Sequence, residues 1–238
     1  MRRANRVSLL LSLLAMAGVV GLDGVRIQPN RIVAGTGYGL LEALGVTGLI
    51  AVCLPLGLIA GLALYPGRGR TRLMLVLVMA VLLALPWALG GAIAGLIAPA
   101  QTAARAAIGA GSWLLVFALV LMLVDLRQRL RLGAGVSALL WMAPLASLAA
   151  ALVRGRLDQL ALVREYLGRR AAFFDALVDH LVLVGLAVGA SLVIAVALAL
   201  WMRRAPRIRQ ATLGILSFIQ TIPSLALFGL LNIQLFQG

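Results

Sequence analysis

Long apolar runs separated by short clusters of arginine are the feature that most constrains how this chain can fold. Most of the runs hold about 20 residues, the length that an α-helix needs to cross the hydrocarbon core of a bilayer. Hydrophobic residues make up 63% of the sequence, compared with about 45–50% in soluble domains. The pattern therefore predicts an all-α, polytopic membrane protein with about seven transmembrane helices. The expected spans are residues 7–22, 40–65, 73–98, 110–126, 134–153, 180–202 and 211–231.

The first apolar run follows a basic start, MRRANR, and is the shortest of the seven. Such a run can be an uncleaved signal anchor, or a secretory signal peptide with Ala15-Met16-Ala17 as its cleavage site. We favour the signal anchor because many more spans follow it. Both alternatives place the next segment on the outer side of the membrane, so the predicted topology does not depend on the choice.

The arginine clusters predict the orientation of the spans. The net charge is +14, and the 21 basic residues are all arginine. Arginines gather at the N-terminus and in the second, fourth and sixth loops. The first and third loops carry few arginines, and those of the fifth loop are partly offset by acidic residues. Because positive loops stay in the cytoplasm, the N-terminus should be cytoplasmic and His180 should lie at the outer face. The hinge of Arg203, Arg204, Arg207 and Arg209 should be cytoplasmic. No basic face remains outside these clusters, so we do not expect nucleic-acid binding.

Residues 154–179 break the pattern, because they carry charges of both signs and no apolar run of membrane length. Leu160, Val163 and Leu167 fall at roughly helical spacing. The segment is either one or two amphipathic helices at the membrane surface or a solvated helical linker. If there are two helices, Gly168 would separate them.

The last expected span contains a polar and proline break formed by Gln220, Thr221, Pro223 and Ser224. Pro223 removes a backbone donor and frees a carbonyl one turn earlier. A polar break at membrane depth is costly unless protein or a cavity shelters it. The break is either a kink that satisfies its own polar groups or the lining of a path for a polar solute. These four residues are therefore the candidate substrate pathway.

Catalytic chemistry is not expected, and we predict that the chain is not an enzyme. The sequence holds one histidine, His180, and one cysteine, Cys53, which leaves no disulfide within the chain and no metal site built on these residue types. No carboxylate pair, Ser-His-Asp set or phosphate-binding loop occurs at plausible spacing. We interpret Glu42, near the start of a span, as a solvated helix-end residue, with proton coupling as the alternative.

Four stretches of the sequence resemble a single protein family. They are PNRIVAGTG at residues 29–37, IGAGSWL at 108–114, REYLGRRAAFFDALVDHL at 164–181 and IQTIPSLALFGLL at 219–231. In this order they are similar to the permease subunits of bacterial ABC importers for osmoprotectants such as glycine betaine and choline. The last stretch is the most specific. The likeness extends almost to the end of the chain and favours the longer branch of the family, which carries extra N-terminal spans ahead of the transport core.

The resemblance implies a transport core whose N-terminus lies outside, in agreement with the position that the charge pattern gives His180. It implies an N-terminal block at residues 1–153, a linker at 154–179 and the first two core helices at 180–238. The implied partners are a cytoplasmic ATPase, which would bind the ATP, a periplasmic substrate-binding protein, a second permease copy or a sister permease, and membrane lipid. The chain itself would hold no cofactor and would lie in the bacterial inner membrane.

Permeases of this family couple to their ATPase through an E-A-A…G loop, and this sequence has no such motif. We therefore expect that the chain is truncated after its second core helix and does not transport on its own. An alternative from another functional class is a membrane-embedded accessory or scaffold protein with no transport activity.

Overall fold

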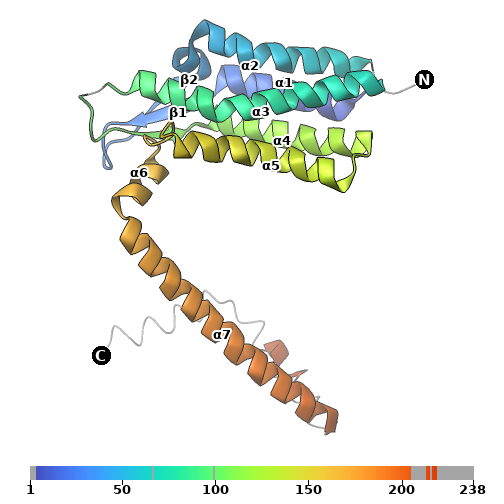
Figure 1. The fold of residues 1–238 in the computed structure, drawn as a ribbon, viewed down its shortest axis with the longest axis vertical. Coiled ribbons are helices and arrows are strands. Elements are labelled where there is room, and N and C mark those ends of the chain that lie inside the picture. Colours follow the sequence, from blue (N-terminus) through green and yellow to red (C-terminus); the bar gives the residue numbers. More distant parts are fainter. Residues whose placement is uncertain (1–3, 66, 99, 205–212, 215, 219–238) are drawn as a thin grey trace. The chain divides into compact units, whose positions relative to one another are not determined.

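The computed structural model describes residues 4–65, 67–98, 100–204, 213–214 and 216–218. The chain divides into two compact units, residues 1–169 and 170–238, which we describe one at a time. The first unit contains the helices α1 (Arg6–Gly21), α2 (Leu40–Leu64), α3 (Arg68–Leu96), α4 (Ala110–Leu130), α5 (Ala134–Val153) and α6 (Ala161–Gly168) (Figure 1). The long helix α7 (Arg170–Arg204) belongs to the second unit.

The helices α1 to α5 form a bundle, in which α1 packs against α2 and α4, and α3 packs against α2, α4 and α5. The bundle core is made almost entirely of aliphatic side chains from these helices, such as Leu56, Ile59, Leu115 and Leu119, which are fully buried. The N-terminus and the turns α2–α3 and α4–α5 lie at one end of the bundle, and the strands and α6 lie at the other (Figure 1). The chain therefore crosses the bundle back and forth, as alternating loops require.

Among the described residues, five helices are long and apolar enough to cross a membrane: α2, α3, α4, α5 and α7. The prediction of an all-α polytopic membrane protein is confirmed. Helix α1 is apolar but shorter than these five. Most of the expected seventh span lies outside the described residues, so the total of seven stays a prediction.

A small antiparallel sheet was not predicted. It consists of β1 (Asp23–Gln28), β2 (Thr36–Gly39) and β3 (Arg105–Ile108), in the order β2-β1-β3. The proline and glycines of residues 23–39 predict a polar loop, and residues 99–109 are expected to be a short connection between spans. The sequence of β1 explains the sheet. Val25 and Ile27 are buried and Arg26 between them is exposed, which is the alternation of a strand with one covered face.

Helix boundaries differ from the predicted spans, because a helix continues past the apolar run into charged residues. Helix α3 begins at Arg68 instead of residue 73, and α4 runs beyond Asp125 to Leu130. Helix α7 begins at Arg170 and passes through His180 without interruption. Arginine has high helix propensity, so a change in polarity alone does not end these helices.

The segment 154–179 holds the whole of α6 and the start of α7. Helix α6 ends at Gly168 and α7 starts at Arg170, so the expected separation of two helices at Gly168 is confirmed. The boundary between the two compact units also falls here, after residue 169. The proposed division into an N-terminal block, linker and core stays a prediction.

The proline in α3 does not break that helix. Proline within an apolar run predicts a kink or a break near Pro86, but α3 continues from Arg68 to Leu96 with Pro86 inside it. In α2 the non-helical residue is Gly45, with φ 69° and ψ −179°, and not Pro55. Membrane helices tolerate proline because neighbouring groups satisfy the freed carbonyl.

Candidate functional site

The residues that the sequence singled out lie mostly outside the described part of the chain. These are Gln220, Thr221, Pro223, Ser224, Arg207 and Arg209. Arg203 and Arg204 occupy the last turn of α7, and the side chain of Arg203 is exposed. The candidate substrate pathway and the cytoplasmic hinge therefore stay predictions.

The structure instead brings together three loops that are distant in sequence. The β1–β2 hairpin, the loop with β3, and the segment from the end of α5 through α6 meet at one end of the bundle (Figure 1). We call this assembly, residues 23–39, 100–109 and 154–168, the loop cap. The three loops are those that the arginine pattern predicts on the outer side, and their common position at one end is what that topology requires.

Glu165 is the central charged group of the loop cap. Its carboxylate accepts hydrogen bonds from Arg105 in β3 and from Arg31 in the hairpin, so one acidic side chain from α6 joins all three loops. The Arg105 and Arg31 guanidinium groups hold the pKa of the Glu165 carboxyl below its usual range. Charge-assisted hydrogen bonds favour the ionised form, so Glu165 is negatively charged at neutral pH.

Backbone contacts reinforce these ion pairs. The guanidinium group of Arg164 donates to the carbonyl oxygens of Ala104 and Thr102. The N–H of Ala106 donates to the carbonyl of Gln159 at 2.9 Å, beside a bridge between Ala106 and residue 160. The segment before α6 therefore docks on the outer edge of β3, which satisfies backbone groups that an edge strand would otherwise leave open.

Sequence reasoning missed the residues of the loop cap. It took Glu165 only as one of several acidic groups that offset arginines, and Arg31 and Arg105 only as sparse loop charges. One local signal is the short alternation of Val25, Arg26 and Ile27, which is typical of a strand and could have indicated β1. No local pattern pairs residues as far apart in sequence as Arg31 and Glu165.

A polar hollow of about 600 Å³ opens on the loop cap next to the end of α3. Its polar lining comes from Gln101, Thr102, Asp158, Gln159 and Arg164. The Oε1 atom of Gln159 is buried and has no hydrogen-bond partner among the described residues. The hollow thus offers both donors and acceptors on the face that the predicted topology turns outward.

The opposite end of the bundle holds a second polar cluster around Asp125 of α4. Its carboxylate accepts hydrogen bonds from Asn5 at 2.9 Å, from Ser8 at 3.4 Å and from Arg129 at 2.8 Å. The N–H of Asn5 also donates to the carbonyl of Ala63 at the end of α2, at 2.8 Å. Asp125 therefore holds the start of α1 against α4, and the Asn5 backbone holds it against α2.

Polar side chains within the spans serve packing. The indole of Trp87 in α3 donates to the hydroxyl of Ser147 in α5 at 3.0 Å, and Ser147 donates to the carbonyl of Leu83 at 2.7 Å.

Glu42 accepts from the N–H of Gly39 at 3.0 Å and so caps the start of α2. This position agrees with the interpretation of Glu42 as a helix-end residue. Among the described residues, no group of three His, Cys, Asp or Glu side chains could hold a metal ion.

Comparison with known proteins gives one family. A family model described as "ABC transporter permease YehY, N-terminal domain" matches residues 4–163. No curated protein and no solved structure gives a significant match to the chain. The matched region contains the whole bundle and ends within α6, so it includes nearly all of the loop cap.

Proposed function

Because the chain belongs to the YehY family of ABC transporter permeases, we propose that it serves an importer of a quaternary-amine osmolyte such as glycine betaine or choline. The family makes the protein a membrane-embedded transport subunit that works with a separate ATPase. The match over residues 4–163 is the observation that carries the proposal. The choice of osmolyte rests on the resemblance of residues 219–231 to osmoprotectant permeases, quoted above.

In this proposal the two compact units have different tasks. The bundle forms a rigid membrane block, because its buried polar side chains, Asn5, Ser8, Ser12, Ser112 and Ser137, all have hydrogen-bond partners. Helix α7 opens the transport core, which the Gln220–Ser224 break would help to line. The Arg203–Arg209 hinge would lie in the cytoplasm. The partner ATPase binds the ATP, so the chain needs no cofactor of its own.

The remaining partners follow from the same proposal. A periplasmic substrate-binding protein delivers the osmolyte to the outer face of the permease, in the inner membrane of a bacterium. A second permease copy or a sister permease completes the pathway. The predicted topology supports this arrangement, because it turns the loop cap toward the compartment in which the binding protein would move.

Uptake measurements test the proposal directly. Cells that lack other osmolyte importers, and that carry the intact transporter genes, should take up labelled glycine betaine or choline. Deleting the gene of this protein should abolish that uptake, and restoring it should return the uptake to the original level. Uptake of neither compound, with uptake of a different solute, would refute the proposed substrate but not the permease assignment.

A second candidate function is a scaffold that assembles the complex but moves no solute. The internal pairing of the bundle's buried polar groups favours such a role for residues 4–169. In that case, deletion would leave uptake of both osmolytes unchanged, although the protein would still copurify with a complete permease. The same deletion strain therefore separates the two functions.

A further inference from the structure

The tip of the β1–β2 hairpin, residues 29–34, carries an exposed apolar surface. Its sequence is PNRIVA, so four of its six residues are apolar. All six residues are exposed, and the side chain of Ile32 is 94% exposed. Turns in water are usually built from glycine and small polar residues. Apolar residues that gather on an exposed surface, unlike single ones, mark interaction sites.

Hydrogen bonds fix the conformation of this tip. The carboxamide oxygen of Asn30 accepts from the N–H of Ile32 at 2.8 Å and from the N–H of Val33 at 2.9 Å. Directly below the tip, the two strands pair as far as Ile27 opposite Thr36. The tip is therefore held in one shape, and a preorganised loop loses little conformational freedom when it binds a partner.

The charge of the tip is neutralised within the protein. Arg31 is its one charged residue, and the guanidinium group of Arg31 donates to the carboxylate of Glu165 in α6. The apolar residues that follow Arg31 are thus not beside an unpaired charge. Because α6 ends at Gly168 and α7 begins at Arg170, the same ion pair joins the tip to the segment that leads into α7.

The place of the tip in the hairpin favours a soluble partner. The base of the hairpin lies at the ends of α1 and α2, where Asp23 pairs with Gly39. The tip lies at the other end of β1, which has six residues and so extends about 20 Å at 3.3 Å per residue. The predicted topology turns this end of the bundle outward. A protruding apolar tip fits an apolar socket on another protein, whereas a small solute needs a concave site.

We propose that the hairpin tip is a docking point for the soluble substrate-binding protein, in which Ile32 and Val33 enter an apolar socket on that protein. This inference rests on the proposed function, which supplies a soluble protein on the outer side. The Arg31–Glu165 ion pair links the docked tip to α6.

Binding measurements with the assembled transporter in nanodiscs test the proposal. The probe is the purified substrate-binding protein, and the readout is its Kd for the transporter. Ile32→Asp places a carboxylate in the socket. Leu162→Asp is the matched control, because Leu162 lies in α6 of the same loop cap and is 82% exposed. Both side chains are exposed, so neither substitution disturbs the packing of the cap.

We expect Ile32→Asp to weaken binding about tenfold or more, as for a central apolar contact of an interface. Leu162→Asp should leave the Kd unchanged. Equal Kd values for the two variants would overturn the proposal.

Photocrosslinking in intact cells identifies the partner. A photoreactive amino acid at position 32 of the intact transporter should give a product that contains the substrate-binding protein. A product with lipid or with a second permease copy in its place would overturn the proposal. Neither readout depends on the solute. If the cells import a different solute and the crosslink forms, the proposed osmolyte is refuted and the docking point stands. Osmolyte uptake without this crosslink would refute the docking point alone.

Discussion

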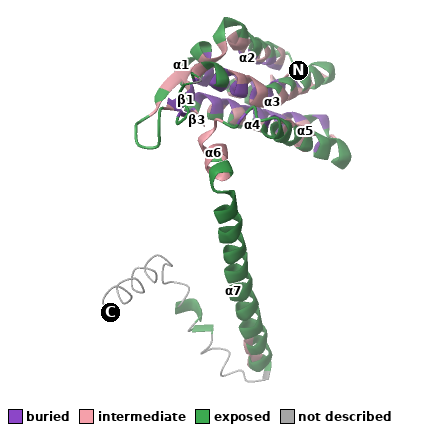
Figure 2. Cartoon of the chain, turned by 60° about the vertical axis from the view of Figure 1, so that its left-hand side comes forward, coloured by how far each residue is buried: buried purple, intermediate pink, exposed green. Residues whose placement is uncertain are grey.

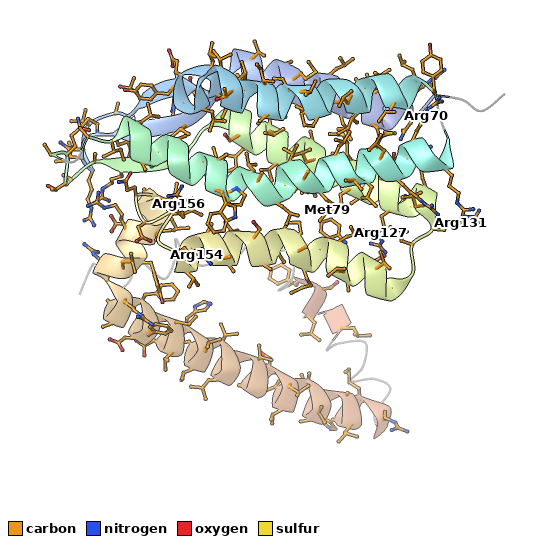
Figure 3. The ribbon with its side chains drawn as sticks, turned by 45° about the horizontal axis from the view of Figure 1, so that its top comes forward. Arg70, Met79, Arg127, Arg131, Arg154 and Arg156 are labelled. Carbon is orange, nitrogen blue, oxygen red and sulfur yellow. The ribbon has the colours of Figure 1, made fainter. Side chains whose placement is uncertain are left out.

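The two ends of the helix bundle carry arginine in different ways. At the end with the N-terminus, Arg70, Arg127 and Arg131 lie in or beside short turns (Figure 3). The Arg70 guanidinium lies 5.8 Å from the ring centroid of Tyr65 and donates to its carbonyl. At the other end, Arg31 and Arg105 are bound by Glu165 within a folded cap. One end displays positive charge, and the other neutralises part of it.

The arginine pattern predicts that the loop cap lies on the outer side of the membrane, and this difference would explain how that side tolerates so many arginines. A positive loop favours the cytoplasm, yet the segment after α5 is rich in arginine. In the structure, Glu165 and a carbonyl group of the loop cap bind three arginines of the cap, Arg31, Arg105 and Arg164. The two ends also differ in burial. Val25 of β1 and Ala106 of β3 are buried, while the turns at the other end are largely exposed (Figure 2).

The largest effect is expected for Gly109→Ala, at the start of α4 in the loop cap. A Cβ atom there would lie 2.2 Å from the carbonyl oxygen of Asp23, and this neighbour is backbone that cannot rotate away. We expect a loss of about 3 kcal/mol or more in unfolding free energy, at the upper end of overpacking effects. The measurement is denaturant unfolding in detergent, followed by tryptophan fluorescence.

Gly133→Ala is the matched control at the other end of the bundle. Gly133 also precedes a helix with extended backbone, but a Cβ atom there meets nothing within 4 Å. Both variants replace glycine by alanine at the position before a helix. The resulting loss of unfolding free energy is the same in each, about 1 kcal/mol or less. Equal destabilisation by the two variants would show that the cap is not packed as described.

A smaller loss is expected for Asp125→Ala, at the end with the N-terminus. It leaves Asn5, Ser8 and Arg129 without their shared acceptor, and a partly buried hydrogen bond to a charged group contributes about 1.5–3 kcal/mol. We expect Asp125→Ala to lower the unfolding free energy by about 2 kcal/mol in the same unfolding assay. Arg129→Ala should lower the unfolding free energy by only about 0.3–0.5 kcal/mol, because Arg129 and Asp125 form an ion pair one helical turn apart near the surface. A larger loss from Arg129→Ala than from Asp125→Ala would contradict this account of the cluster.

The smallest effect should be confined to acidic pH. The Arg105 and Arg31 hydrogen bonds lower the folded-state pKa of Glu165, so its contribution is complete above the ordinary glutamate value of about 4.3. The contribution is lost as the pH falls below that value and through the lowered pKa. Amide-exchange protection of the loop cap should therefore decline on acidification below about pH 4.3 in the wild type. Glu165→Gln should show weaker protection with no decline of this origin, and identical profiles would refute the role of Glu165.

The helices of the bundle could be predicted from the sequence, and the loop cap could not. Helices α2 and α5 follow apolar runs whose length and composition are local properties. The strands are only four to six residues long, too short for periodicity to be decisive. Their pairing joins β1 to β3 across the intervening spans, and Glu165 binds a partner 134 positions away. Long-range contacts of this kind leave no trace in a local pattern.

The central claim is that the loop cap lies on one side of the membrane, and that the α2–α3 and α4–α5 turns with their arginines lie on the other. Its most direct test is labelling of single cysteines in intact cells with a membrane-impermeant maleimide, in a Cys53→Ala background. Ile32→Cys places a thiol at the tip of the β1–β2 hairpin, where Ile32 is 94% exposed. Gly69→Cys places one in the exposed first turn of α3, just after the turn that follows α2. The account predicts labelling of Ile32→Cys in intact cells and of Gly69→Cys only after permeabilisation. The reverse pattern, or equal labelling of both before permeabilisation, would contradict it.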